Sequence, residues 1–480
     1  MNSANSLTGV DTILLDPNAT GPSPASGAFG PPASPARVTT VQPTAALPIV
    51  TDDLVMWGEG SSITTIDVGA TVGDPRRGLH VQGDVTLTLS GLTIQNAVAS
   101  GFGGGILLEG GATGANLHAT DIHLLNNAAN DGEGGGLALI GSGTQATLEE
   151  SVIDGNRTIA GTIVRPGGGI TVTAGTSLTM IAGSISGNQS DDGWGGAIRA
   201  IDFGTITLDG VTLDGNEALD PSGGYGGALH AEVAGAVVIT GTTITNNSAA
   251  LEGGGFRFVG GATLSMTQST VADNTAATAA GAPSSNGAIS ITELAFERNT
   301  ATAGAGGLWL GVGSVVTAQS VDFVDNAGGA HSGAVVLAGV THDFDGGRVE
   351  GNQANFAGGF NVADGATTIE NMVFTSNESF TSSAGGLASQ FAATLVVRDS
   401  EFTANTSAVA GGGLWIAGGA ATLERVVVTG NNATLNGGGL TAGSPTSTTI
   451  VASTISGNTA GRRGGGVNAG AGPVTIENST

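Results

Sequence analysis

The chain has 480 residues, including 85 Gly and only 4% aromatic residues, so small aliphatic and β-branched side chains must fill its core. The 14 Pro and the lack of a Gly-X-Y period exclude collagen, and the absence of Cys excludes disulfides and thiolate metal sites. A net charge of −26 argues against a nucleic-acid partner, because so acidic a surface repels phosphate.

The N-terminal residues 1–53 are interpreted as a cap region, with a Pro/Ala-rich insertion at 20–48. They lack a basic stretch followed by an apolar one, so no signal peptide is visible. No run of about 18 apolar residues that could span a bilayer occurs anywhere in the chain. The pattern in 54–480 stops partway through a unit at Thr480, and we expect an export signal and an anchor beyond the two ends.

One unit recurs along most of the chain. A glycine cluster closed by an apolar residue, such as Gly195-Gly196-Ala197-Ile198, is followed by alternating Thr, Val and Ile and then by an Asn. These Asn residues recur at intervals of 25 to 32 residues, and the positions three and eight residues before each of them are always apolar. The thirteen are Asn127, Asn156, Asn188, Asn216, Asn247, Asn274, Asn299, Asn326, Asn352, Asn377, Asn405, Asn431 and Asn458.

The length of the unit and its residue pattern predict an all-β, right-handed parallel β-helix. Units of about 27 residues with short runs of period-2 alternation, broken by Gly and Asn, contain two or three strands each. Strands one unit apart then pair in parallel, and each coil rises by about 4.8 Å. About fourteen coils, forming a rod of roughly 65 Å, are expected.

Both repeated residue types have a mechanical interpretation. Asn tolerates a left-handed backbone at a corner, and its amide can bond to the Asn above and below, which predicts a structural Asn ladder. The glycines permit a second corner and a close approach of neighbouring coils.

Two stretches of the sequence resemble known β-helix proteins. The Gly-Gly-Ala-Ile element and Phe-x-x-Asn, as at 296–299 and 402–405, resemble the repeats of polymorphic outer-membrane proteins. Residues 9–13, 47–51 and 54–60 resemble the start of CSLREA-type proteins, although the hallmark hexapeptide is absent. The resemblance implies a bacterial protein that is extracellular or displayed at the cell surface, and adhesion is known for some such proteins. The autotransporter barrel of the first group does not lie within these residues, so the resemblance leaves the mode of anchoring open.

A candidate ligand-binding strip follows from the repeat. In the strand after each glycine cluster the first apolar residue points inward, so the next one is predicted to point outward. The strip consists of Trp194, Arg199, Tyr225, His230, Arg257 and Trp309. Aromatic rings stack on sugar rings, and Arg binds hydroxyls or uronate carboxylates, so the expected partner is a carbohydrate or a host or cell-surface protein. The same side chains could equally solvate an outward face.

The alternative function is a polysaccharide lyase or glycoside hydrolase built on the β-helix. Asp191, Asp192, Glu232 and Arg257 could supply the carboxylates and the base, but no spacing requires it. We therefore assign no catalytic residue and expect no cofactor. No metal site is expected either: His118, Asp121 and His123 do not clearly share a face, and no calcium-loop motif occurs.

Overall fold

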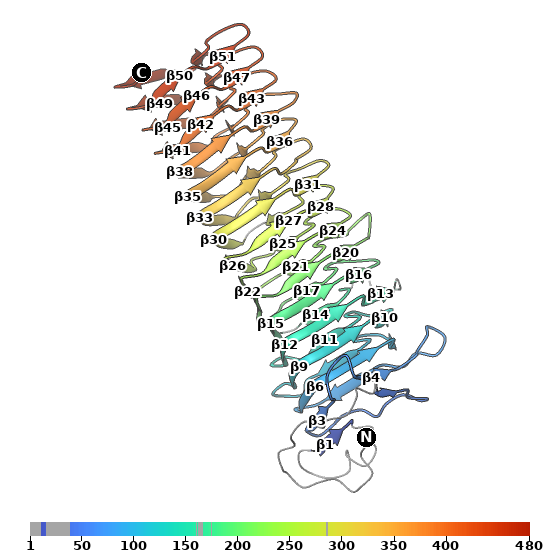
Figure 1. Ribbon diagram of the computed structural model, residues 1–480. Helices are drawn as coiled ribbons and strands as arrows, with labels where there is room; N and C mark the ends of the chain where they lie inside the picture. The colour runs from blue at the N-terminus through green and yellow to red at the C-terminus, as the bar shows by residue number, and fades with distance from the viewer. Residues whose placement is uncertain (1–10, 16–38, 160, 162–166, 174, 285–286) are drawn as a thin grey trace.

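The computed structural model describes residues 11–15, 39–159, 161, 167–173, 175–284 and 287–480. They form a parallel β-solenoid of about sixteen coils of about 27 residues, in which no helix occurs within the described ranges (Figure 1). Coil stacks on coil from the N-terminal end to the C-terminal end, and all pairings between the strands are parallel.

Three faces run along the rod, and most coils contribute to all of them. Face A is the 25-stranded sheet β1 (Asp11–Leu14), β2 (Thr39–Val41), β3 (Leu54–Trp57), β4 (Thr64–Asp67), β6 (Thr86–Gln95), β9 (Asn116–Leu125), β12 (Gln145–Asp154), β15 (Ser177–Ser186), β18 (Thr205–Asp209), β19 (Thr212–Asp214), β22 (Ala236–Thr240), β23 (Thr243–Thr245), β26 (Thr263–Thr267), β27 (Thr270–Ala272), β30 (Ala288–Glu297), β33 (Val315–Val324), β35 (Thr341–Glu350), β38 (Ala366–Thr375), β41 (Thr394–Arg398), β42 (Glu401–Thr403), β45 (Ala420–Glu424), β46 (Val427–Thr429), β49 (Ser447–Val451), β50 (Thr454–Ser456) and β53 (Val474–Glu477).

Face B, which follows the glycine clusters, is the 15-stranded sheet β5 (Leu79–Gln82), β8 (Ile106–Glu109), β11 (Leu137–Ile140), β14 (Ile170–Thr173), β17 (Ile198–Ile201), β21 (Leu229–Glu232), β25 (Phe256–Val259), β29 (Ala282–Ser284), β32 (Leu308–Leu310), β34 (Val335–Leu337), β37 (Phe360–Val362), β40 (Leu387–Ser389), β44 (Leu414–Ile416), β48 (Leu440–Ala442) and β52 (Val467–Ala469).

Face C, which follows the Asn residues, has eight strands, β7 (Val98–Ser100), β10 (Ala128–Asn130), β13 (Arg157–Ile159), β16 (Gln189–Ser190), β20 (Glu217–Ala218), β24 (Ser248–Ala249), β28 (Thr275–Ala276) and β31 (Thr300–Ala301), and then five, β36 (Gln353–Ala354), β39 (Glu378–Ser379), β43 (Thr406–Ser407), β47 (Asn432–Ala433) and β51 (Thr459–Ala460). Single bridges from Thr300 to Ala327 and on to Gln353 join the two parts.

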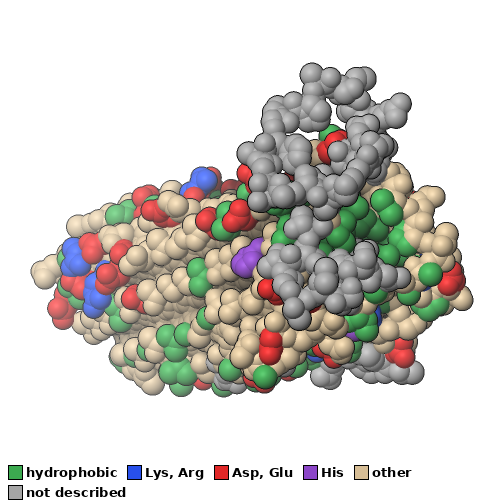
Figure 2. Space-filling view, turned by 90° about the horizontal axis from the view of Figure 1, so that it is seen from below, with side chains coloured by type: hydrophobic (Ala, Val, Ile, Leu, Met, Phe, Trp, Pro, Cys, Tyr) green, Lys and Arg blue, Asp and Glu red, His purple; other side chains and the backbone are tan. Residues whose placement is uncertain are grey.

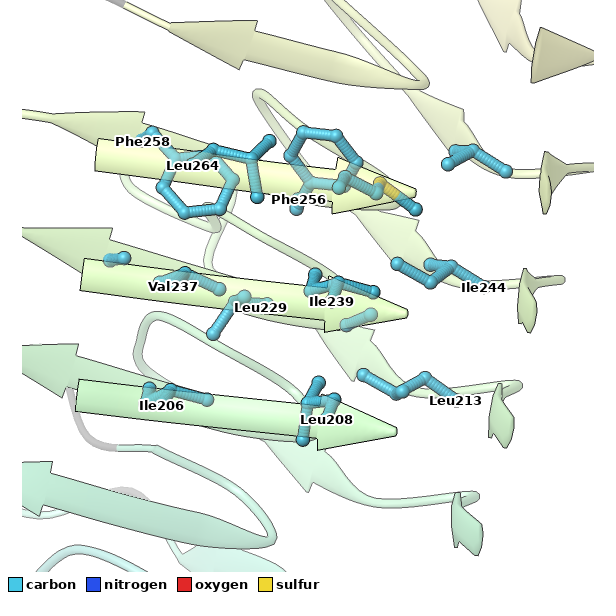
Figure 3. Packing of buried hydrophobic residues seen from close by; sticks show 14 of the residues in the cluster. Ile206, Leu208, Leu213, Leu229, Val237, Ile239, Ile244, Phe256, Phe258 and Leu264 are labelled. Carbon is cyan, nitrogen blue, oxygen red and sulfur yellow. The ribbon is translucent and has the colours of Figure 1, made fainter. Parts of the chain in front are cut away.

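The core is a set of apolar columns, as the sequence predicts. Alternation on face A turns every second side chain inward, and parallel register places equivalent side chains above one another, such as Leu208 on Ile239 and Leu213 on Ile244 (Figure 3). The side chains three and eight positions before each ladder Asn are buried, except Ile455 in the last such coil, which is partly exposed. Phe residues fill the columns in the C-terminal half, where Phe374 and Phe402 stack at 4.5 Å.

The thirteen Asn residues form one ladder, buried from Asn127 to Asn431 and partly exposed at Asn458. Each Nδ2 donates to Oδ1 of the Asn in the next coil at 2.9–3.0 Å, from Asn127 to Asn458. The same Oδ1 also accepts the backbone N–H of the preceding ladder residue. Nδ2 donates its second hydrogen to a backbone carbonyl one coil back, as from Asn299 to Val271. The twelve amides from Asn127 to Asn431 are thereby fully hydrogen-bonded away from water.

The predicted left-handed backbone at the Asn itself is wrong. Positive φ occurs at the residue immediately before each ladder Asn, for example 52° at Arg298 and 56° at Ala404. That residue makes the corner, and the Asn that follows can then point its side chain inward. A second left-handed residue lies six positions before each Asn and bends face A, as at Arg425 with a φ of 54°.

The corner position allows a test with two variants in adjacent coils. Ala404 and Gly430 both have a positive φ, of 56° and 63°, and a Cβ added at Gly430 would meet nothing closer than Ala404 N at 4.0 Å. We expect Gly430→Ala to lower the free energy of unfolding by about 1 kcal/mol through backbone strain alone. Ala404→Gly should raise the free energy of unfolding, because Gly adopts a positive φ without that strain. Urea unfolding followed by circular dichroism measures both, and shifts of the same sign would contradict this explanation.

The glycine clusters let the coils approach, as predicted. A Cβ at Gly412 would lie 2.4 Å from the carbonyl oxygen of Gly438 in the next coil, and one at Gly104 would lie 2.4 Å from that of Gly135. Any side chain at these positions would therefore force neighbouring coils apart.

The solenoid has about two coils more than the fourteen expected from the Asn spacing. The additional coils precede the first Asn: β3 and β4 both pair with β6, and β1 pairs with β3. Ala97 occupies the ladder position there, and its N–H donates to Asn127 Oδ1 at 3.0 Å, so a search for Asn misses these turns. Most of the predicted insertion at 20–48 lies outside the described residues. Nowhere in the described part of the chain is there a helix with the length and apolarity that a membrane crossing needs.

Candidate functional site

The residues of the predicted strip lie on face B and on the turn before it. Arg199, His230 and Arg257 are directly paired on β17, β21 and β25, and Trp194 is bridged to Tyr225 in the turn. Five of the six residues thus lie on three consecutive coils. Trp309, on β32, is two coils beyond Arg257, and its ring packs edge-on against His331 at 5.1 Å.

The prediction that this column is an open outward surface is wrong. Trp194, Arg199 and His230 are 4%, 7% and 0% exposed, whereas Tyr225, Arg257 and Trp309 remain partly accessible. The turns at Trp194 and Glu133 fold over the outer side of face B and cover this part of the column. The same layer recurs further along, where Phe356 packs on Trp415 at 5.6 Å. Five strip residues therefore form a packed cluster, which consists of Trp194, Arg199, Tyr225, His230 and Arg257. Tyr225 and Arg257 form its exposed margin.

The aromatic rings hold the cluster together. The Trp194 and His230 rings are 4.5 Å apart, and the Trp194 and Tyr225 rings are 5.7 Å apart. The Arg257 guanidinium lies over the Tyr225 ring, with Cζ 4.0 Å from the ring centre. Such a contact stabilises the cation through the negative face of the ring, so Tyr225 and Arg257 fix each other at the margin.

Two carboxylates that the sequence reasoning missed neutralise the arginines. Arg199 Nη1 donates to Glu133 Oε2 at 2.5 Å, and Arg257 Nε donates to Glu252 Oε2 at 2.7 Å. Burial raises the pKa of Glu133, and the adjacent Arg199 opposes that rise. Both Glu residues stand directly before a glycine cluster, in the position of Trp194 and Tyr225, so comparing that position from coil to coil would have found them.

His230 is neutral within the cluster. Burial lowers the pKa of His230 to about 4, and the nearby Arg257 and Arg199 add to that effect against the contribution of Glu232. Among the described residues neither ring nitrogen has a hydrogen-bond partner, and Nε2 lies 3.6 Å from Glu232 Oε2. The His230 ring packs as an aromatic surface against both Trp194 and Tyr225.

The four residues considered for catalysis lie in and beside the cluster. Asp191 and Asp192 are partly exposed in the turn before Trp194, Glu232 Oε2 lies 3.6 Å from His230 Nε2, and Arg257 is paired with Glu252. The carboxylates that contact the arginines of the cluster, Glu133 and Glu252, are each held in an ion pair. A carboxylate fixed in an ion pair is poorly suited to take up and release a proton.

The three residues considered as metal ligands, His118, Asp121 and His123, do not share one set of contacts. His118 is exposed, whereas Asp121 and His123 both contact Ser61: Ser61 Oγ donates to Asp121 Oδ1 at 2.6 Å and lies 3.1 Å from His123 Nε2. Ser61 N also donates to Asp121, so these contacts attach the turn at Ser61 to face A two coils later. Within the described ranges, no three His, Asp or Glu side chains are grouped to hold a metal ion.

No model of a known protein family and no curated protein matches the sequence. What the chain itself defines is a class of architecture, the parallel β-solenoid of about sixteen turns. Function must be argued from the shape of the rod and the chemistry of the Trp194 to Arg257 cluster.

Proposed function

We propose that the chain is an exported bacterial surface rod, structural and adhesin-like, that contacts carbohydrate or a cell-surface protein at the margin of the cluster. The observation that carries the proposal is the pair Tyr225 and Arg257, an aromatic ring and a guanidinium held in contact on the side of a long, regular solenoid. A rod of about sixteen coils extends roughly 75 Å, which would present that margin away from an anchor. The resemblance to polymorphic outer-membrane protein repeats and CSLREA-type starts supports the surface location.

The margin suits an extended ligand better than a small one. Tyr225 and Arg257 are partly exposed, and Trp309 is a further partly exposed aromatic side chain, two coils beyond Arg257 and three coils beyond Tyr225. Three coils correspond to about 14 Å, the length of roughly three sugar units. Aromatic surfaces at that spacing, with one fixed cation between polar turns, fit an oligosaccharide with acidic or hydroxyl groups.

A glycan array tests the proposal with variants of these accessible residues. We expect the wild-type chain to bind a subset of glycans, and Tyr225→Ala and Trp309→Ala each to weaken that binding by about tenfold through loss of a stacking surface. Trp57→Ala is the matched control, because Trp57 is an exposed aromatic side chain on face A, outside the cluster. Equal binding by all four proteins, or no binding by the wild type to glycans or bacterial and host cell surfaces, would contradict the proposal.

A further inference from the structure

A pocket of about 330 Å³ lies beside β5, the first strand of face B, far from the Trp194 cluster. Leu47, Ile49 and Ala99 contribute apolar walls, and Arg76, Arg77 and His80 contribute cationic or polar groups. A volume of this size can accommodate a small organic molecule on an open side of the rod, and apolar walls with a few polar groups are typical of binding sites.

Arg77 is a partly buried cation without a carboxylate partner among the described residues. Its Nε donates to the carbonyl oxygens of Phe102 and Gly103 at 3.1 and 2.9 Å, and its Nη2 donates to that of Phe102 at 2.9 Å. These acceptors are neutral and fix the guanidinium without cancelling its charge. Burial lowers the pKa of Arg77, and the more distant Glu109 offsets only part of that effect.

The other arginines show how unusual this is. Arg298, Arg348, Arg398 and Arg425 each contact two carboxylates on the surface. Figure 2 shows basic side chains beside acidic ones at one end of the rod. The described arginines without a carboxylate, apart from Arg77, are Arg157, Arg462 and Arg463, and all three are exposed to water. A chain with a net charge of −26 has carboxylates in excess, yet none in the described part of the chain forms an ion pair with Arg77.

We propose that this pocket binds a small organic carboxylate. The carboxylate would accept hydrogen bonds from Arg77 Nη1, which has no hydrogen bond within the described residues, and the apolar part would lie against Leu47, Ile49 and Ala99. A guanidinium held in place by backbone carbonyls loses little freedom when it binds a carboxylate. His80 lies at the edge of the site, where its Nε2 is 3.0 Å from Glu109 Oε2.

Calorimetric titration with hexanoate, and with 1-hexanol as the uncharged analogue, tests the site. We expect the intact chain to bind hexanoate with a Kd on the order of 1 mM and hexanol at least about tenfold more weakly. Arg77→Gln should weaken hexanoate binding by at least about tenfold, since it removes the charge. Arg463→Gln, at an exposed position near the other end, should leave the Kd unchanged.

A second variant separates loss of binding from loss of folding. Ala46 is an exposed residue of the pocket wall, so Ala46→Glu should repel hexanoate and leave the thermal midpoint unchanged. Equal hexanoate affinity in the wild type, Arg77→Gln and Ala46→Glu would overturn the proposal. Equal affinity for hexanoate and hexanol, or no detectable binding of hexanoate at about 10 mM, would also overturn it.

Discussion

Asn299→Ala is expected to lower the free energy of unfolding by about 3–5 kcal/mol, which is one of the two largest effects on stability that we predict. Asn299 lies in the middle of the buried ladder and accepts the N–H and Nδ2–H of Asn274. It also donates to Val271 O and to Asn326 Oδ1. The substitution leaves two buried donors and one buried carbonyl without these partners, at a cost of about 1–3 kcal/mol for each unsatisfied group.

The matched control is Asn432→Ala, which removes an amide of the same size from an exposed position in face C. Its side chain accepts one hydrogen bond, from Thr459 Oγ1, so we expect a change below about 0.5 kcal/mol. Guanidinium unfolding monitored by far-ultraviolet circular dichroism compares both variants with the wild type. If Asn299→Ala and Asn432→Ala were equally stable, the ladder would be a by-product of the repeat and not a source of stability.

Acidification is expected to destabilise the fold through a second buried histidine, His342. This residue lies in the core on β35, where its Nδ1 is 3.0 Å from Thr367 Oγ1 and its Nε2 accepts the N–H of Gly339 at 3.2 Å. Burial lowers the pKa of His342 to about 4, whereas an unfolded His titrates near 6.5. The unfolded chain therefore binds a proton first, and this contribution to stability is complete above pH 6.5 and lost as the pH falls towards 4.

The expected loss from His342 between pH 7 and pH 4.5 is about 2.5 kcal/mol. His342→Leu should reduce the pH dependence of the unfolding free energy by about that amount, although it lowers stability at pH 7 because the Gly339 N–H loses its acceptor. His118→Gln, at an exposed site, should leave the pH dependence unchanged. An unaltered pH dependence in His342→Leu would show that the His342 ring is accessible to protons in the folded chain.

Much of the architecture could be predicted because one residue type repeats with the coil. The Asn column and the two apolar columns set the register, and the structure stacks them as the spacing implies. The corner geometry could not be predicted, because Arg298, Ser376 and Ala404 occupy left-handed positions that more often contain Gly. Tertiary stacking fixes these corners against the local preference of the backbone.

The candidate site was predicted less well. Alternation along a strand tells which side chains point away from the core, and Arg199 and His230 do so. It does not tell whether a turn folds over that side, and here the turns at Trp194 and Glu133 do. Because that layer comes from contacts between segments of different coils, periodicity within one coil contains no information about it.

The central claim, that equivalent residues of successive coils stack in register, can be measured with pairs of nitroxide labels in solution. The chain has no Cys, so single cysteines can be introduced on face A without background. Ser265 is separated from Thr368 by four coils and from Thr422 by six along one column of paired residues. Double electron–electron resonance should give backbone separations of about 19 and 29 Å, a constant increment of about 4.8 Å per coil. Distances that do not increase in proportion to the number of intervening coils would contradict the stacked solenoid.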